Sequence, residues 1–107
     1  MELIYLSGPM TNDPNYRENF NYFEDLFEAS GYRVFNPVNL SDMLIKKHNL
    51  TSDQAFLEKN RNLFLREDVK AMLDCTKVVM LPGWKKSKGA KLERKIAEML
   101  GMEVAYV

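Results

Sequence analysis

The sequence predicts a single α/β domain, residues 1–107, in a compact three-layer fold with a parallel sheet of strand order 2-1-3-4. The length of 107 residues is that of one domain. Short apolar runs of strand length alternate with longer segments of helical periodicity. Residues 77–81 are apolar along nearly their whole length, which suits a parallel strand covered on both faces. Strands that alternate with helices imply right-handed crossovers and therefore a parallel sheet.

The N-terminal part of the chain holds the first two strands and the first helix. Residues 3–6 form a short apolar run that ends in the turn at residues 7–9. The next segment is helical, because aromatic residues recur at spacings of three and four: Tyr16, Phe20, Phe23 and Phe27. Gly31 is expected to end this helix. Residues 33–36 are expected to form the second strand, which Pro37 ends.

The middle of the chain has a weaker pattern. Residues 38–52 suit one or two helical turns followed by a loop. Ser52 or Asp53 is placed to cap the next helix, expected over residues 53–74. The apolar side of that helix is expected to consist of Phe56, Leu63, Leu65, Val69, Met72 and Leu73.

The C-terminal part holds a strand, a helix and a last strand. The helix is expected over residues 89–100 and the last strand over residues 103–107, with Gly101 ending the helix. The side of the helix that faces the sheet is expected to consist of Leu92, Ile96, Met99 and Leu100.

The predicted strand order, that of flavodoxin-like and Rossmann-like sheets, also predicts where a ligand binds. In such sheets ligands lie beyond the carboxyl ends of the strands, near the point where the strand order reverses. Strands 1 and 3 flank that point, and they end at residues 7–9 and 82–84.

Composition narrows the function classes. Fifteen acidic residues balance fifteen basic ones, which gives no global argument for binding a nucleic-acid polymer or a membrane. The single His48 rules out a His-rich metal site, and the single Cys75 cannot form an internal disulfide, which fits a reducing compartment. The start of the chain does not resemble a signal peptide and no apolar stretch is long enough to span a bilayer, so a cytoplasmic location is expected.

One local cluster departs from the even charge balance. Residues 85–95 hold six basic residues and one acid, Glu93. Such a cluster attracts a small anion such as a phosphate, or it is simply a solvated helix face.

The turn after the first strand is a candidate binding loop. Gly8 would let a ligand approach the backbone, Ser7 and Thr11 can donate hydrogen bonds, and Pro9 completes the turn. The same residues also suit a plain strand-ending turn. Tyr5, on the strand just before, either packs in the core or uses its hydroxyl there, since a buried hydroxyl needs a partner.

The start of the last helix is a second candidate. Helix starts carry unpaired N–H groups and bind anions, so Ser87, Lys88 and Gly89 could hold a phosphate. Ser87 could equally be an ordinary N-cap. Trp84 could stack on a base or close the end of the core.

Two acids are candidates for catalysis. Glu93 shares a helix face with Ala90 and Ala97, and the neighbouring basic residues are expected to keep it ionised. It is either a nucleophile toward an electrophilic sugar carbon or a surface glutamate in salt bridges. Glycosidic chemistry needs a second acid, for which Asp68 and Glu67 are the candidates, although a lone Asp68 would equally suit the surface.

Taken in order, these motifs resemble a known superfamily. The chain has a strand ending in SGPMT (residues 7–11), a helix carrying RED (66–68), a strand ending in LPGW (81–84) and then SKGAKLE (87–93). This order resembles the nucleoside 2-deoxyribosyltransferase-like superfamily, most closely its short bacterial and phage members. The superfamily also includes 2'-deoxynucleoside 5'-phosphate N-hydrolases. The resemblance covers nearly the whole chain.

The resemblance implies roles for the catalytic candidates. Glu93 matches the nucleophile that attacks C1' of the deoxyribose and forms a glycosyl–enzyme intermediate. Asp68 matches an aspartate that handles the proton on the leaving base, and Tyr5 matches an aromatic position that helps to orient the nucleophile. Ser7 and Gly8 match the first loop that contacts phosphate or sugar.

The resemblance also implies the ligand. Ser87 and Gly89 match the loop that holds the 5'-phosphate in the nucleotide hydrolases, whereas the nucleoside transferases have an aspartate at the Ser87 position. A serine beside lysines such as Lys88 therefore favours a nucleotide over a free nucleoside. No metal or organic cofactor is implied, and a homodimer or larger assembly is expected by analogy.

Two departures limit the resemblance. Many relatives have an aspartate where this chain has Thr76, and the transferases continue beyond the position of Val107 to close a neighbouring subunit's site. Hydrolysis of a 2'-deoxynucleotide is therefore the leading hypothesis over deoxyribosyl transfer. The alternatives are a nucleotide-binding module without turnover and a purely structural oligomer subunit.

Overall fold

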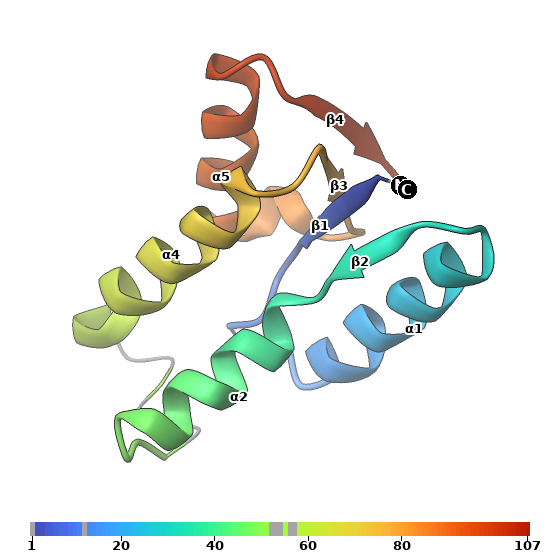
Figure 1. Cartoon of the computed structure of the whole chain (residues 1–107). Helices are drawn as coiled ribbons and strands as arrows, with labels where there is room; N and C mark the ends of the chain where they lie inside the picture. Colours follow the sequence, from blue (N-terminus) through green and yellow to red (C-terminus); the bar gives the residue numbers. More distant parts are fainter. Residues whose placement is uncertain (1, 12, 52–54, 56–57) are drawn as a thin grey trace.

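The computed structural model describes residues 2–11, 13–51, 55 and 58–107, which form a sheet with helices packed against it (Figure 1). The sheet is all parallel, with the order β2-β1-β3-β4, so the predicted fold and strand order are confirmed. The elements in chain order are β1 (Leu3–Ser7), α1 (Tyr16–Ala29), β2 (Arg33–Phe35), α2 (Pro37–Lys47), α4 (Glu58–Leu73), β3 (Lys77–Met80), the short 3-10 helix η1 (Trp84–Lys86), α5 (Lys88–Met99) and β4 (Glu103–Tyr106).

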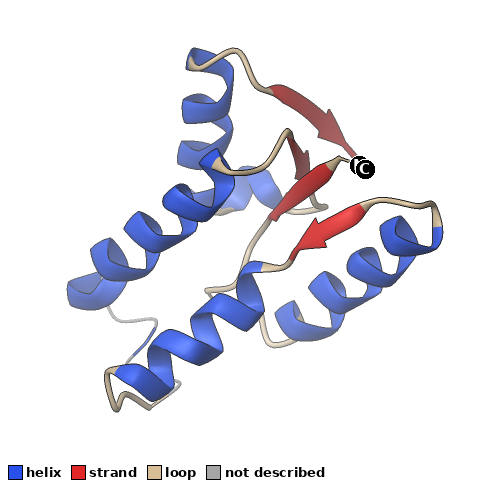
Figure 2. Ribbon diagram, viewed as in Figure 1, coloured by secondary structure: helices blue, strands red, loops and turns tan. Residues whose placement is uncertain are grey.

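Helices lie on both faces of the sheet (Figure 2), and an apolar layer fills the space on each face. Neighbouring residues of β1 and β3 point to opposite faces, as the strand repeat requires. Ile4, Leu6 and Val79 pack with Phe20 of α1 on one face. On the other face, strand residues including Tyr5, Val78 and Met80 pack with α4 and α5 through Met72, Ala90 and Ala97.

Helix α2 is longer than the sequence predicts. It has eleven residues where one or two turns were expected. Pro37 does end the strand, but it also occupies the first helical turn, where a proline is tolerated because its missing N–H needs no partner there. The Asn36 side chain accepts a hydrogen bond from the Val38 N–H at 3.0 Å and so caps the helix. A strand end and a helix start share these two residues.

Helix α4 agrees with the predicted helix in type but only partly in its buried side. Ser52, Asp53 and Phe56 lie outside the described residues. Met72 is fully buried, as predicted, whereas Leu73 is 49% exposed. Leu73 is the last helical residue and lies about 100° further round the helix than Met72, which turns it away from the sheet.

The predicted buried side of the last helix is confirmed at Ile96, which packs against the core, and is wrong at its other three residues. Leu92, Met99 and Leu100 are 40%, 76% and 60% exposed. The side of α5 that faces the sheet consists of Ala90, Glu93 and Ala97. The strands already supply bulky side chains such as Tyr5 and Met80 to this layer, so a close approach of the helix requires small residues.

Both glycines predicted to end helices do so in the left-handed region. Gly31 has φ of 95° and Gly101 has φ of 72°, conformations that residues with a Cβ rarely adopt. The helices in the described part of the chain are all too short or too polar to cross a bilayer.

Candidate active site

A cavity of about 330 Å³ opens at the carboxyl ends of β1 and β3, where the strand order reverses. Its walls come from the end of β1, the loop that follows, α1, α2, α4 and the start of α5. Segments that are far apart in the sequence therefore meet at the position predicted from the strand order.

The carboxylate of Glu93 lies inside this site and is held by β1. Glu93 is only 5% exposed. The Tyr5 hydroxyl donates to its Oε2 at 2.7 Å, and the Ser7 hydroxyl donates to its Oε1 at 2.7 Å. These two bonds fix the carboxylate plane against the sheet, because each oxygen has its own donor.

Burial, rather than the neighbouring basic residues, dominates the ionisation of Glu93. Burial raises the pKa of Glu93 from 4.5 to about 7, and the hydrogen bonds from Tyr5 and Ser7 oppose that rise. The expectation that neighbouring basic residues hold Glu93 ionised is therefore wrong. Lys88 and Lys91 are exposed, and Arg94 pairs with Glu98 instead.

Asp68 lines the same cavity from α4. Its Oδ1 atom is buried and has no hydrogen-bond partner among the described residues. Burial, followed by the charges of Glu93 and Glu67, raises the pKa of Asp68 from 3.8 to about 8. Of the two acids, Asp68 is therefore the one that keeps its proton to the higher pH.

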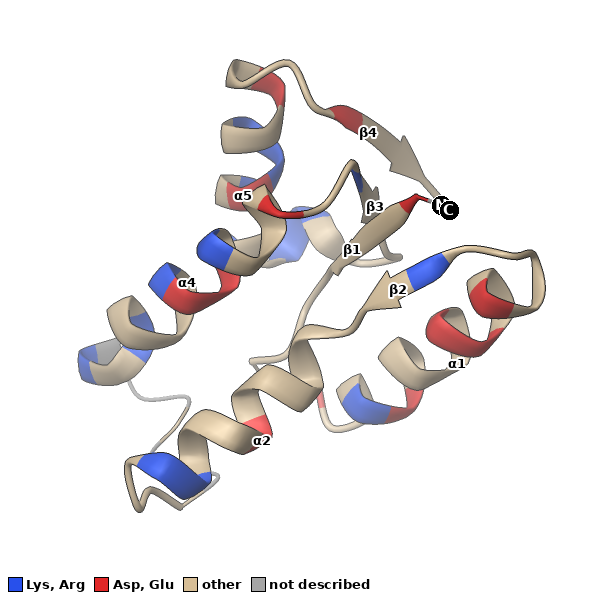
Figure 3. Ribbon diagram, viewed as in Figure 1, with Lys and Arg blue, Asp and Glu red and all other residues tan. Residues whose placement is uncertain are grey.

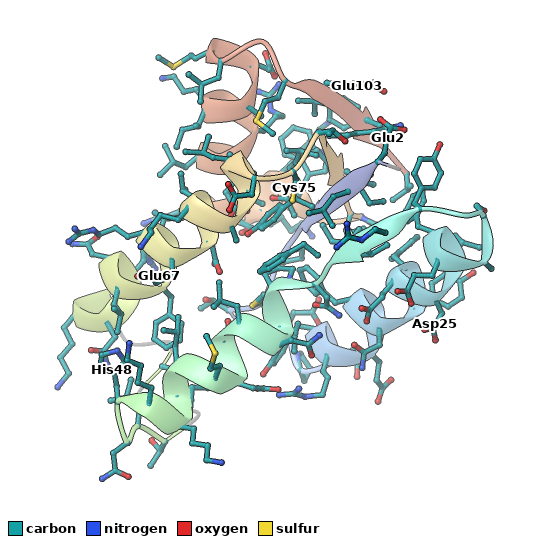
Figure 4. The ribbon with its side chains drawn as sticks, viewed as in Figure 1. Glu2, Asp25, His48, Glu67, Cys75 and Glu103 are labelled. Carbon is teal, nitrogen blue, oxygen red and sulfur yellow. The ribbon has the colours of Figure 1, made fainter. Side chains whose placement is uncertain are left out.

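The other candidate acid, Glu67, does not line the cavity. It lies on α4 (Figure 4) and its carboxylate is 3.8 Å from the Lys70 ammonium. Of the two candidates for a second acid, the structure brings only Asp68 beside Glu93.

The two predicted binding loops both contribute to the wall. Gly8 and Thr11 line the cavity from the first loop, and Ser87, Lys88 and Gly89 line it from the second. Ser87 also caps α5, since its hydroxyl accepts a hydrogen bond from the Ala90 N–H at 3.1 Å.

Gly8 has a packing role as well. A Cβ at this position would lie 2.9 Å from the Leu81 Cβ, so any other residue here would force the two strand ends to shift apart.

Three predicted binding residues lie outside the wall that the described residues form: Ser7, Pro9 and Trp84. The Ser7 hydroxyl donates to Glu93 instead of facing the cavity. Pro9 packs beside Gly83, where an added Cβ would come within 3.3 Å of the Pro9 Cγ. The Trp84 ring centre lies 5.6 Å from that of Tyr106, and the Arg94 guanidinium lies 4.9 Å above the Trp84 ring. Of its two expected roles, Trp84 therefore has the one that closes the core.

Several lining residues were missed by the sequence analysis. Helix α4 contributes Arg61, Phe64 and Leu65 in addition to Asp68. Their spacing would have placed them on one helix face with Asp68. Figure 3 shows basic residues both on α4 and around the start of α5, and of these Arg61, Lys86 and Lys88 line the cavity.

The described residues do not form a recognisable metal-binding cluster. Within the described residues, no group of three or more His, Cys, Asp or Glu side chains could hold a metal ion. The site offers two acids at its inner end and basic residues on its wall, which suits an organic anion.

A comparison with family models identifies the family of this chain. Residues 2–106 match the model described as Domain of unknown function (DUF4406), and the chain belongs to that family. No curated protein matches the chain.

Proposed function

We propose that this DUF4406 chain is an enzyme that hydrolyses the N-glycosidic bond of a 2'-deoxynucleoside 5'-phosphate. The observation that carries the proposal is the arrangement of two acids in one cavity. Glu93 is buried and oriented by Tyr5 and Ser7, and Asp68 lies beside it with an unpartnered oxygen.

In the first step Glu93 is the nucleophile and Asp68 is the acid. A Glu93 oxygen attacks C1' of the deoxyribose, and the bond between C1' and the base nitrogen breaks. The electron pair of that bond stays on the base, which takes the proton of Asp68. Ionised Glu93 and protonated Asp68 coexist because the pKa of Asp68, about 8, is above that of Glu93, about 7.

In the second step water releases the sugar. Asp68, now ionised, takes a proton from a water molecule whose oxygen attacks C1'. The bond between C1' and the Glu93 oxygen breaks, and the electron pair returns to the carboxylate. The products are the free base and 2-deoxyribose 5-phosphate, and both acids regain their starting states.

The start of α5 suits the 5'-phosphate. It combines the N–H groups of a helix start with Ser87, Lys86 and Lys88 on the cavity wall. Two lysines together with the helix start match the charge of a phosphate monoester, which a free nucleoside lacks. This feature favours a nucleotide substrate.

The resemblance to the nucleoside 2-deoxyribosyltransferase-like superfamily supports the same chemistry. Its motifs assign Glu93, Asp68 and Tyr5 to the nucleophile, the acid and the orienting aromatic. It also supports a dimer or larger assembly, and the exposed Leu92 and Met99 on α5 suit a surface covered by another copy. The buried, unpaired Cys75 suits the reducing cytoplasm that the proposal assumes.

The experiment measures free base released from each 2'-deoxynucleoside 5'-monophosphate. Wild-type protein is expected to release base, and Glu93→Gln is expected to lose at least about 100-fold in rate because an amide is a poor nucleophile. Glu98→Gln makes the same change on the exposed side of α5 and should retain activity. The proposal fails if wild-type protein at high concentration releases no base from any of these nucleotides.

The alternative is a module that binds a nucleotide without turnover. Thr76 was one motive for it, but Thr76 lies just before β3, at the end of the sheet opposite the cavity, and donates to the Leu3 carbonyl at 3.2 Å. The departure at this position therefore does not alter the site. The alternative predicts nucleotide-dependent thermal stabilisation with no base release, and the stabilisation would persist in Glu93→Gln.

A further inference from the structure

Helix α4 presents a continuous stripe of side chains to the cavity. The lining residues Arg61, Phe64, Leu65 and Asp68 are separated by three, one and three positions, which is the spacing of one helix face. The stripe begins at a guanidinium, passes through two apolar side chains and ends at the buried acid. Arg61 lies about 10 Å from Asp68 along the helix axis, at 1.5 Å per residue.

The chemistry of the proposed function places the base along this stripe. An acid that protonates the leaving nitrogen must come within about 2.6–3.2 Å of the base. Because Asp68 projects from α4, the base must lie against α4. The 5'-phosphate is directed instead to the start of α5, so Phe64 and Leu65 are left to contact the base ring.

The opposite wall suits a flat aromatic ring. Pro37, Ser41 and Ile45 line the cavity from α2, which packs against α4. The Ser41 hydroxyl is 3.9 Å from the Met10 sulfur, so its own hydrogen bond is weak. A base between these walls would meet apolar surface on its faces, and Arg61 lies at the end of the α4 stripe away from Asp68.

From this arrangement we propose that Arg61 reads the outer edge of the base and selects bases that carry a carbonyl oxygen there. This inference rests on the proposed function for the orientation of the substrate. A guanidinium carries five N–H donors and no acceptor. It therefore pairs with O6 and N7 of guanine or with O4 of thymine and uracil, and it opposes the amino groups of adenine and cytosine.

Two features make Arg61 suited to this role. It is half-buried, so its donors are only partly hydrated before a ligand binds. It already interacts with another group of the chain, and a residue with five donors can keep that contact while it donates to a base.

The test compares the binding of four nucleotides, and it does not require turnover. Thermal stabilisation by dGMP, dTMP, dAMP and dCMP is titrated for wild-type protein, Arg61→Gln, Arg61→Lys and the control Arg66→Gln. Arg66 is an exposed residue of the same helix that does not line the cavity. Unliganded melting temperatures show whether each variant is folded.

Wild-type protein is expected to bind dGMP and dTMP roughly 10-fold or more tightly than dAMP and dCMP, and Arg66→Gln is expected to match it. Arg61→Gln should lose this preference and gain affinity for dAMP, because an amide pairs with N6 and N7 of adenine. Arg61→Lys keeps the charge but loses the planar fork, so the affinity for dGMP should fall toward that for dAMP and dCMP, which should stay near the wild-type value.

Three results would overturn the inference: no preference in the wild type, an equal loss for all four nucleotides in Arg61→Gln, or no binding of any of them. An equal loss would assign Arg61 to the phosphate instead. Binding with the expected preference but without base release would refute the proposed function and leave the role of Arg61 intact. Base release without a preference among the four nucleotides would refute the role of Arg61 and leave the proposed function intact.

Discussion

Replacing Asp68 by asparagine is expected to stabilise the protein at alkaline pH. The change keeps the shape of the side chain and removes its ability to ionise. Burial raises the pKa of Asp68 from 3.8 to about 8, so the folded state resists ionisation that the unfolded chain accepts freely. At about 1.4 kcal/mol for each pKa unit, the free-energy cost is at most roughly 6 kcal/mol above pH 8. Relaxation around the charge reduces it, and we expect about 3 kcal/mol.

The sign follows from the direction of the pKa shift. The folded-state pKa of Asp68 is raised. Below pH 3.8 Asp68 is neutral in both the folded and the unfolded state and does not reduce the unfolding free energy. As the pH rises from 3.8 toward 8, the unfolded chain ionises Asp68 more readily than the folded state does, so the unfolding free energy falls. Asparagine does not titrate and avoids that loss. The difference in unfolding free energy between Asp68→Asn and wild type should therefore be smallest below pH 3.8, be partly developed at pH 5 and reach its full value near pH 9.

The measurement is urea denaturation of both proteins at pH 5, 7 and 9, followed by circular dichroism. Other titrating groups are common to both proteins and largely cancel in the difference. Asp74→Asn removes an exposed carboxylate just beyond the end of α4 and should change stability by less than about 0.5 kcal/mol at each pH. A difference for Asp68→Asn that does not grow between pH 5 and pH 9 would refute the reasoning.

Three further predictions concern the site and its supports. The rate of base release should be bell-shaped in pH with a maximum between about 7 and 8, and Tyr5→Phe should move its acidic limb upward because the lost hydrogen bond had lowered the pKa of Glu93. Gly8→Ala should lower the unfolding free energy by about 1–3 kcal/mol in urea denaturation, because the new Cβ meets Leu81; an unchanged value would contradict the 2.9 Å contact. Ala97→Leu should lower the unfolding free energy by a similar amount, because the larger side chain overpacks α5 against the sheet. An unchanged unfolding free energy would mean that this side of α5 is not tightly packed.

The strand order could be predicted because each strand is marked locally. Residues 77–81 are apolar and end at Pro82, and residues 3–6 end at a similar turn. Alternation with helices then leaves few ways to assemble a parallel sheet. The length of helix α2 could not be predicted in the same way. Asn36 and Pro37 both end β2 and begin α2, and the sequence pattern marks only the strand end clearly.

The orientation of α5 could be predicted only in part. The sequence places Ala90, Glu93 and Ala97 on one face, and the structure agrees. It does not say that this face is the inner one, because hydrophobicity favours the side with Leu92 and Met99. The choice depends on the size of the strand side chains opposite, such as Tyr5, which is a property of the assembled layer and not of the helix.

The sequence marks the cavity wall only in part. A lone Asp68 on a helix equally suits the surface, and nothing local in the sequence shows that Arg61 and Leu65 face the same cavity. Helical spacings of three and four place residues on one face of a helix, but they do not show what that face contacts. The face can be assigned to a cavity only when one of its residues is known to line that cavity.

The two buried acids do not support the proposed function equally. The two hydrogen bonds of Glu93 tie α5 to β1, so its burial has a structural explanation even without a ligand. Asp68 has no such explanation, since its buried Oδ1 has no partner among the described residues and its ionisation is unfavourable. A buried polar atom without a partner is rare in folded proteins and calls for a reason beyond packing. A base nitrogen in the cavity would supply that partner, so Asp68 is the stronger structural argument that this cavity binds a substrate.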